Sequence, residues 1–182
     1  GGKYLQPKFY TTVYDHDGNV LLDISETQEK RKVLKKSTAW LLTDAMKDVL
    51  TAGTGTRAYF GNSMAQAGKS GTTTSNLDCL GAGYTPYYTG AVWFGFDQQT
   101  SISNKGISSS VAVRLWKNVM SRVHDGLSSK ELAVSDNLIE VRVCSETGKL
   151  ASSNCTSVRE YFVKGEEPDV YCGESHWVEP EE

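Results

Sequence analysis

The sequence predicts an α/β (α+β) protein in which an antiparallel sheet is flanked by helices. Two segments, 37–50 and 108–124, carry apolar residues at the spacing of one helix face. Between them, residues 65–97 contain three short runs that are rich in β-forming residues and separated by turn signals. Helices that bury an apolar face against such a meander form a layered α/β domain.

The N-terminal part is predicted to form a hairpin followed by a helix. Residues 8–24 alternate apolar and polar side chains on both sides of an Asp-His-Asp-Gly-Asn turn. The helix over 37–50 has Ser37 as its predicted N-cap, and Gly53 follows its end.

Three strands and a second helix are predicted in the centre of the chain. The strands cover Ala65–Thr73, Cys79–Tyr84 and Tyr88–Phe96, with a Thr-Pro turn before the third. The helix over 108–124 is amphipathic. Its predicted apolar side consists of Ala112, Leu115, Trp116, Val119, Met120 and Val123.

The pattern changes after about residue 133. Residues 139–143 alternate as a strand, and three cysteines then follow in quick order. We therefore predict two domains, a main one over 1–133 and a small β-rich, cysteine-containing extension over 134–182.

The charge balance argues against a nucleic-acid-binding protein. The formal net charge is −3 and the sequence pI is about 5.7. A basic cluster, Lys30–Lys32 with Lys35 and Lys36, follows two glutamates, so we interpret it as a solvated segment leading into the helix.

The sequence also lacks the signal of a membrane span. No stretch approaches the ~20 consecutive apolar residues that a spanning helix needs. The chain opens with Gly1-Gly2-Lys3 and no initiating Met, so we expect a piece of a longer polypeptide whose membrane anchor lies outside it.

The stretch Ala67–Thr73, Ala-Gly-Lys-Ser-Gly-Thr-Thr, carries the most chemical information. A phosphate-binding P-loop, G-x-x-x-x-G-K-[ST], requires glycine at position 63, where the chain has Ser63. It also requires a helix directly afterwards, whereas residues 74–78 are typical of a turn. We reject the P-loop.

The residues Lys69-Ser70-Gly71-Thr72 match instead the Lys-Thr/Ser-Gly-Thr motif of serine penicillin-binding proteins and β-lactamases. The flanks are Gly53–Thr56 before the motif, and Gly83–Pro86 and Val92–Asp97 after it. In this order and spacing they resemble the transpeptidase domain of class A, bifunctional penicillin-binding proteins. The resemblance covers roughly residues 1–125 directly. It implies a serine β-lactamase/transpeptidase-like fold, here only its C-terminal part, and the cysteine-containing tail resembles an extension found after some such domains.

The resemblance implies a role for each residue of the motif. Lys69 and Thr72 are the expected catalytic residues: Lys69 adds positive charge, and the Thr72 N–H donates to a developing oxyanion. Ser70, Gly71, Thr72 and Thr73 are expected to bind substrate, with Gly71 providing the clearance that lets it lie close.

The implied function is that of a D,D-transpeptidase, which cross-links peptidoglycan by acyl transfer through a serine. Expected partners are peptidoglycan stem peptides and β-lactam antibiotics, at the extracytoplasmic face of the bacterial cell membrane, with no cofactor for transpeptidation. The chain contains no Ser-x-x-Lys at the required spacing. We expect this motif and Ser-x-Asn in a companion N-terminal segment, together with a glycosyltransferase domain and the anchor, and we expect this chain to be inactive alone.

Two other functions stay open. One is a non-catalytic β-lactam sensor or scaffold that keeps the fold for binding. The other is a serine β-lactamase, which the class A flanks and the long tail disfavour.

The tail cysteines allow three interpretations. Cys144 and Cys155 flank a turn and are candidates for a disulfide, which is the interpretation we favour. Cys144, Cys155 and Cys172 with His176 have the ligand types of a Cys3His zinc site, although the spacing lacks a short Cys-x2-Cys knuckle. Free thiols are the third interpretation.

Three further residues with reactive side chains are not expected to take part in chemistry. His16, in an Asp-rich turn, and His124, at a helix end, are interpreted as solvated. Cys79 is expected to be a buried, inert thiol.

Overall fold

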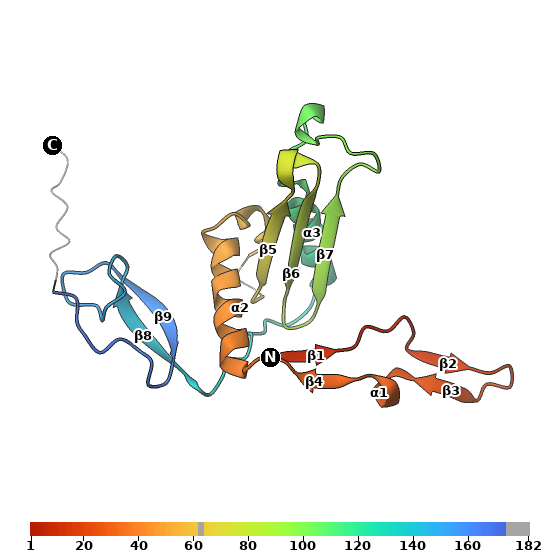
Figure 1. Ribbon diagram of the computed structural model, residues 1–182, viewed down its shortest axis with the longest axis horizontal. Helices are drawn as coiled ribbons and strands as arrows, with labels where there is room; N and C mark the ends of the chain where they lie inside the picture. The colour runs from red at the N-terminus through yellow and green to blue at the C-terminus, as the bar shows by residue number, and fades with distance from the viewer. Residues whose placement is uncertain (62–63, 174–182) are drawn as a thin grey trace. The chain divides into compact units, whose positions relative to one another are not determined.

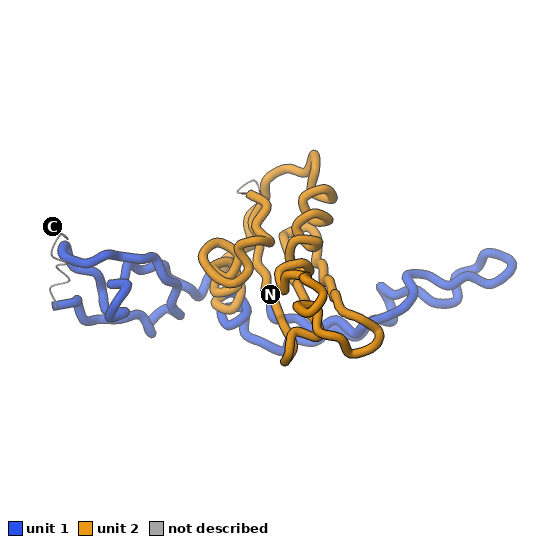
Figure 2. Tube along the Cα trace, turned by 90° about the horizontal axis from the view of Figure 1, so that it is seen from above, with its two compact units in different colours: residues 1–40, 135–182 blue, residues 41–134 orange. Residues whose placement is uncertain are grey.

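The computed structural model describes residues 1–61 and 64–173 of the chain. The chain divides into two compact units, one made of residues 1–40 with 135–182 and the other of residues 41–134 (Figure 2). Each unit is described by itself below.

The second unit holds a three-stranded antiparallel sheet of order β5-β6-β7 (Figure 1). Its elements are the main part of α2 (Lys36–Thr51), η1 (Thr56–Ala58), β5 (Ala67–Thr72), η2 (Thr74–Asn76), β6 (Cys79–Tyr84), β7 (Thr89–Phe94), η3 (Ser103–Lys105) and α3 (Val111–Val123). The predicted class of mixed α/β structure with antiparallel strands and helices is confirmed. The three central strands lie where they were predicted, with β5 and β7 shorter by one or two residues at each end.

One face of this sheet is covered by α3 (Figure 1). Trp116 and Met120 of α3 pack with Leu50, from α2, and Ala58 in a buried cluster. The Trp116 indole N–H donates to the carbonyl oxygen of Gly90 at 3.0 Å, so its buried polar atom has a partner. Full burial of so large a side chain contributes roughly 1.5–3 kcal/mol of hydrophobic stabilisation.

Close packing of α3 on the sheet depends on glycines in β6. A Cβ atom at Gly83 would lie 2.7 Å from Cζ2 of Trp116, and one at Gly81 would lie 3.1 Å from Val113. Cys79 is fully buried with Ile102 and Ala112, which confirms its predicted burial. Alternate positions of β6 are therefore small so that the helix can approach the backbone.

Two details of the predicted helices were wrong. Helix α2 begins at Lys36, so Ser37 lies in its first turn and is not the residue that precedes it. On α3 the buried side is formed by Ala112, Val113, Trp116 and Met120. The predicted members Leu115, Val119 and Val123 are exposed.

The first unit is built from two-stranded antiparallel pairs. Its elements are β1 (Lys3–Leu5), β2 (Thr12–Tyr14), β3 (Val20–Asp23), the short α1 (Ile24–Thr27), β4 (Lys30–Lys32), β8 (Leu138–Cys144) and β9 (Ser157–Val163). The predicted hairpin is confirmed as β2 paired with β3. The predicted strand over 139–143 is confirmed as β8, which pairs with β9.

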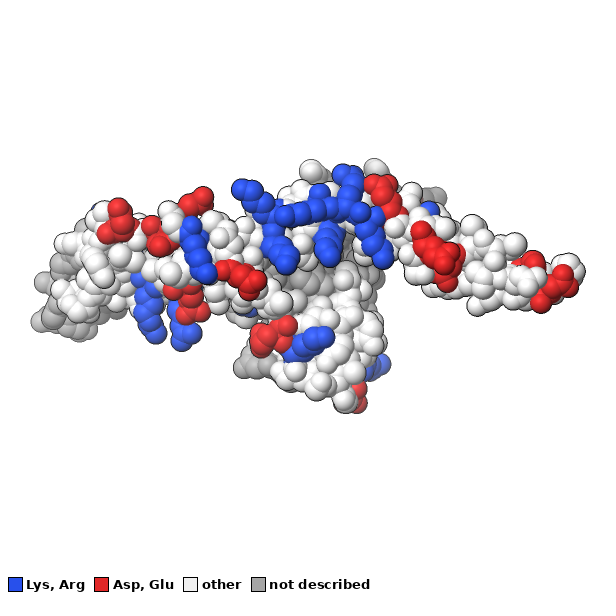
Figure 3. Space-filling view, turned by 90° about the horizontal axis from the view of Figure 1, so that it is seen from below, with Lys and Arg blue, Asp and Glu red and all other residues white. Residues whose placement is uncertain are grey.

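The basic cluster forms a strand that was not predicted. Lys30, Arg31 and Lys32 make up β4 and pair with β1, so that Lys3 lies opposite Lys32. All three are exposed, which agrees with the interpretation of a solvated segment. Lys and Arg side chains gather on one part of the face that Figure 3 shows. The Arg31 guanidinium lies 4.8 Å from the ring centre of Tyr4, which offers it a cation–π contact.

None of the described helices has the length and apolar character needed to cross a bilayer.

Candidate functional site

The motif Lys69-Ser70-Gly71-Thr72 lies on β5, at the edge of the sheet. In the part of the chain that the structure describes, β6 is the only strand that pairs with β5. Residues Ala67 and Gly68 are buried, whereas Lys69 and Thr72 are exposed and the two residues between them are half-buried. The prediction that the motif lies on a strand is confirmed, and no helix begins at Ser70.

The register of β5 on β6 sets the direction of each backbone amide. The Thr73 N–H donates to the Asp78 carbonyl oxygen at 3.0 Å, so it points toward β6. Amide direction alternates along an antiparallel strand. The N–H of Thr72 therefore points away from β6, toward the edge of the sheet, where an edge strand presents hydrogen-bonding groups to a ligand.

An open pocket of about 350 Å³ runs along this edge. It is lined by Thr54, Lys69, Ser70, Gly71, Thr72, Ser109, Ser110 and Val113. Five of these residues carry hydroxyl groups, so the wall is rich in hydrogen-bonding groups. The pocket brings together all four motif residues and adds side chains from two other segments.

Thr54, Ser109 and Ser110 are wall residues that sequence reasoning did not identify. The Thr54 and Ser70 hydroxyl oxygens lie 3.1 Å apart, which links the loop after α2 to the strand. Ser110 directly precedes α3, and its hydroxyl lies 2.9 Å from that of Ser108. The sequence shows these hydroxyl-bearing residues as a Ser-Ser-Ser run at 108–110 and a Gly-Thr-Gly-Thr loop at 53–56. Neither pattern indicates which strand the segment will face.

Lys69 is exposed, and its side chain bends toward the backbone of the next residue. Its Nζ donates to the carbonyl oxygen of Ser70 at 2.7 Å. This contact holds the ammonium group next to the backbone of the motif. A cation there favours an anionic ligand in the pocket.

Thr73 does not line the pocket. Its hydroxyl oxygen accepts a hydrogen bond from the Asp78 N–H at 2.8 Å, closing the connection between β5 and β6. The structure therefore uses this hydroxyl within the chain, and the substrate-binding role expected for Thr73 stays a prediction.

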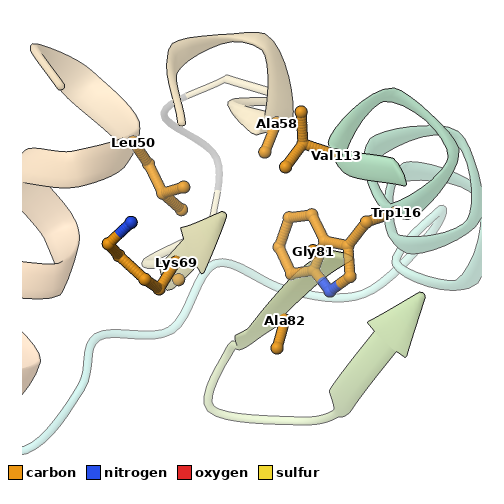
Figure 4. Close-up of a pocket in the computed structure, with 8 residues that line it drawn as sticks. Leu50, Ala58, Lys69, Gly81, Ala82, Val113 and Trp116 are labelled. Atoms are coloured by element: carbon orange, nitrogen blue, oxygen red, sulfur yellow. The ribbon is translucent and has the colours of Figure 1, made fainter. Parts of the chain in front are cut away.

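A small void of about 10 Å³ lies beneath the strand (Figure 4). Leu50, Ala58, Val113 and Trp116 surround it from the helices, and Lys69 is among the strand residues that complete its lining. Apolar side chains thus support the motif strand from inside, and they fix the strand edge to α2 and α3. A site built on such a rigid element holds its groups more precisely than one on a loop.

His124 is buried, so its interpretation as a solvated residue was wrong. Its Nδ1 lies 2.7 Å from the Met120 carbonyl oxygen, which can only accept. Nδ1 therefore donates there, and Nε2 lies 2.7 Å from the Thr85 hydroxyl oxygen. Both nitrogens serve the packing of α3, and His16 is exposed as predicted.

The tail brings three cysteines together. The sulfur atoms of Cys144, Cys155 and Cys172 all lie within 4.8 Å of one another. Hydrogen bonds from the Thr147 hydroxyl and from the backbone amides of Thr147 and Glu146 lower the pKa of the Cys144 thiol to about 6. This arrangement does not test the favoured Cys144–Cys155 disulfide, which stays a prediction. His176 lies outside the described residues.

Family models match two parts of the chain. The penicillin-binding protein transpeptidase domain matches residues 1–100, and the C-terminal domain of penicillin-binding protein 1A matches residues 134–176. The first match covers more than half of the chain.

Individual relatives agree with these models. Penicillin-binding protein 1A of Clostridium perfringens is 34% identical over 172 residues, which is 91% of this chain and 20% of that protein. The protein of the same name from Clostridium tetani is 36% identical over 180 residues, 94% of this chain and 22% of that one. Penicillin-binding protein 1F of Bacillus subtilis is 33% identical over 127 residues, covering 66% and 17%. The chain thus spans about a fifth of the length of the curated relatives it matches.

The fold has a counterpart among solved structures. The crystal structure of penicillin-binding protein 1A from Haemophilus influenzae superimposes with a TM-score of 0.79 over 94% of this chain and 31% of that one. At 21% sequence identity, this likeness establishes the fold alone.

Proposed function

Because the chain belongs to the penicillin-binding protein transpeptidase family, we propose that β5 is the substrate-binding strand of a serine D,D-transpeptidase. The observation that carries the proposal is the Lys-Ser-Gly-Thr motif on an edge strand, with all four residues lining one open pocket. The reaction is acyl transfer: a serine attacks the D-Ala–D-Ala peptide bond, forms an ester and releases the terminal D-Ala, and the amine of a second peptide then takes the acyl group and restores the serine hydroxyl.

In this proposal the backbone of β5 stabilises the transition state. The Thr72 N–H, directed away from β6, donates to the oxyanion that forms on the attacked carbonyl. Ser70 and Thr72 bind the substrate carboxylate with their hydroxyl groups, and Lys69 supplies positive charge beside them. These groups need no cofactor.

The acylated serine is proposed to come from outside this chain. The 182 residues contain no Ser-x-x-Lys motif, and the relatives are about five times as long. We assign the nucleophile and the Ser-x-Asn motif to a companion segment, and place the complete protein at the extracytoplasmic face of the membrane. Its partners are peptidoglycan stem peptides and β-lactam antibiotics, which acylate the same serine.

The test is covalent labelling of the complete protein with a fluorescent penicillin. We expect stable labelling of one serine, no labelling of the 182-residue chain alone, and a rate about 10- to 100-fold lower in Lys69→Ala, since contacts to a charged group are worth roughly 1.5–3 kcal/mol. Lys105→Ala is the matched control, because Lys105 is an exposed lysine of η3 outside the pocket, and it should label at the parental rate.

Other outcomes identify other functions. A label that is lost by turnover indicates a β-lactamase, and a stable label without cross-linking of a peptide donor to an acceptor indicates a sensor. Labelling of Lys69→Ala at the parental rate contradicts the assigned role of the strand.

A further inference from the structure

Three cysteines of the tail meet although they are far apart in the sequence. Cys144 ends β8, Cys155 lies in the loop before β9, and Cys172 follows β9. Their sulfur atoms all lie within 4.8 Å of one another. Cys144 and Cys172 are buried and Cys155 is half-buried, so the cluster is largely closed to solvent. The proposed acyl transfer uses none of these groups.

Backbone contacts hold the three segments together, and next to Cys155 the Thr156 carbonyl oxygen accepts from the Ser145 N–H at 2.9 Å. Leu150 forms bridges with Val143 on one side and with Tyr171 on the other, each a direct neighbour of a cysteine. The Cys144 N–H donates to the Lys149 carbonyl oxygen and the Cys172 N–H to that of Leu150, both at 2.8 Å. The convergence of the sulfurs therefore follows from the strand pairing of the tail and not from rotamers alone.

Hydrogen-bond donors surround the sulfurs. The Thr147 hydroxyl and the amides of Glu146 and Thr147 donate to Cys144. The Ser152 hydroxyl lies 3.3 Å from the sulfur of Cys155. Donors of this kind stabilise thiolate charge and orient thiolates around a metal ion.

We infer that Cys144, Cys155 and Cys172 bind one Zn²⁺ ion that holds the tail module together. Thiolate is a preferred ligand of zinc, with Zn–S distances of about 2.3 Å. A tetrahedral arrangement at that bond length separates the sulfurs by roughly 3.8 Å, so three sulfurs already within 4.8 Å need only a small contraction.

A disulfide explains the cluster less well. Three mutually close sulfurs do not single out the Cys144–Cys155 pair that the sequence favoured, and any one disulfide leaves the third thiol packed against it. A metal ion uses all three. The cluster found among the described residues supplies three of the four ligands of a tetrahedral site.

The test is the metal content of the 182-residue chain as isolated, measured by elemental analysis. We expect about one Zn²⁺ per chain. After chelation, adding Co²⁺ should produce a thiolate-to-metal charge-transfer band that added Zn²⁺ abolishes. Cys155→Ser and Cys172→Ser should each lose at least about 10-fold in metal affinity. Cys79→Ala removes a cysteine of the other unit and should keep the full metal content.

Two results would overturn the inference. One is a chain that carries no zinc and gives no Co²⁺ band with all three thiols reduced. The other is a chain isolated without metal, lighter by the mass of two hydrogens, with two of these cysteines joined. The spectrum of the unmodified chain decides the matter even if a serine variant unfolds the tail.

Discussion

At the scale of single residues, the four positions of the motif differ in what fixes them. Lys69 and Thr72 are exposed and line the pocket. Gly68, the residue before the motif, is fixed by packing, because a Cβ atom there would lie 2.9 Å from the Ala82 carbonyl oxygen. At Gly71 an added Cβ would meet only Leu80, at 3.6 Å, which is ordinary van der Waals contact. Packing within the chain therefore does not require glycine at position 71.

Gly71→Ala should separate folding from function. We expect the free energy of unfolding to stay equal or to rise by up to about 1 kcal/mol, because alanine reduces the entropy of the unfolded chain. The added methyl group takes up space in the pocket, so acylation of the complete protein by a labelled penicillin should slow at least about tenfold, or about 1.4 kcal/mol of transition-state free energy. Unchanged acylation would show that Gly71 provides no clearance for the ligand.

The turn between β2 and β3 makes a prediction about pH. The Asp15 carboxylate accepts hydrogen bonds from the side chain and the amide of Asn19 and from the amide of Asp17. The Asn19 side chain, first among these, holds the pKa of Asp15 below its ordinary value of 3.8. The Asp15 carboxylate therefore stabilises the folded chain at pH values above its unfolded-state pKa. This stabilisation is lost as the pH falls through the lower pKa of the folded state.

An NMR titration measures this directly. The amide signal of Asn19 should shift with a midpoint below 3.8, and Asp15→Asn should remove the transition. A midpoint above 3.8 in the parent chain would mean that the turn does not favour the carboxylate.

Residue types alone did not disclose two of the local environments. His124 at a helix end was interpreted as solvated, but its ring is buried between the Met120 carbonyl and the Thr85 hydroxyl. The sequence favoured a Cys144–Cys155 pair and did not show that Cys172 lies beside both, because the bridges made by Leu150 join segments that are far apart in the sequence. Contacts of this kind depend on strand register, which spacing does not encode.

At the scale of elements, the sheet and its helix fit because β6 is lined with small residues. A Cβ atom at Gly83 would lie 2.7 Å from the Ala67 carbonyl oxygen and 2.7 Å from Cζ2 of Trp116. Neither group has room to move, because one belongs to the motif strand and the other is buried in the core.

Gly83→Ala should therefore destabilise the fold, in contrast to Gly71→Ala. Overpacking of a dense core costs typically 1–3 kcal/mol, so the midpoint of thermal or urea unfolding should fall measurably. Gly71→Ala on the adjacent strand is the matched control. Equal stability of the two variants would contradict the packing of α3 on β6.

Most elements could be predicted from periodicity, but the buried side of α3 could not be predicted fully. Ala112, Trp116 and Met120 are buried as expected, whereas Leu115, Val119 and Val123 are exposed on the neighbouring face. The apolar side of α3 is wider than the area that the sheet covers. The sequence pattern therefore does not show which of its apolar residues are buried. Likewise β4 was missed because three basic residues give no strand signal, and only its pairing with β1 defines it.

At the scale of the whole molecule, we propose that the pocket beside β5 is one wall of an active site. The motif and its flanks were sufficient to identify the family from the sequence, since their order and spacing are distinctive. The structure adds the hydroxyl-lined pocket and the direction of the Thr72 amide. The nucleophile could not be located, because no Ser-x-x-Lys motif exists in these 182 residues.

The central claim is that the backbone N–H of Thr72 stabilises the oxyanion, and proline removes that group. Because this N–H points away from β6, proline at position 72 breaks no bond of the β5–β6 ladder. The decisive measurement is the acylation rate constant of the complete protein with a labelled penicillin in Thr72→Pro and in Thr72→Ala. We predict a 10²- to 10³-fold loss (about 2.7–4 kcal/mol) in the proline variant, and a loss below about tenfold in the alanine variant, which keeps the N–H. Equal rates in the two variants, with both folded, would contradict the account.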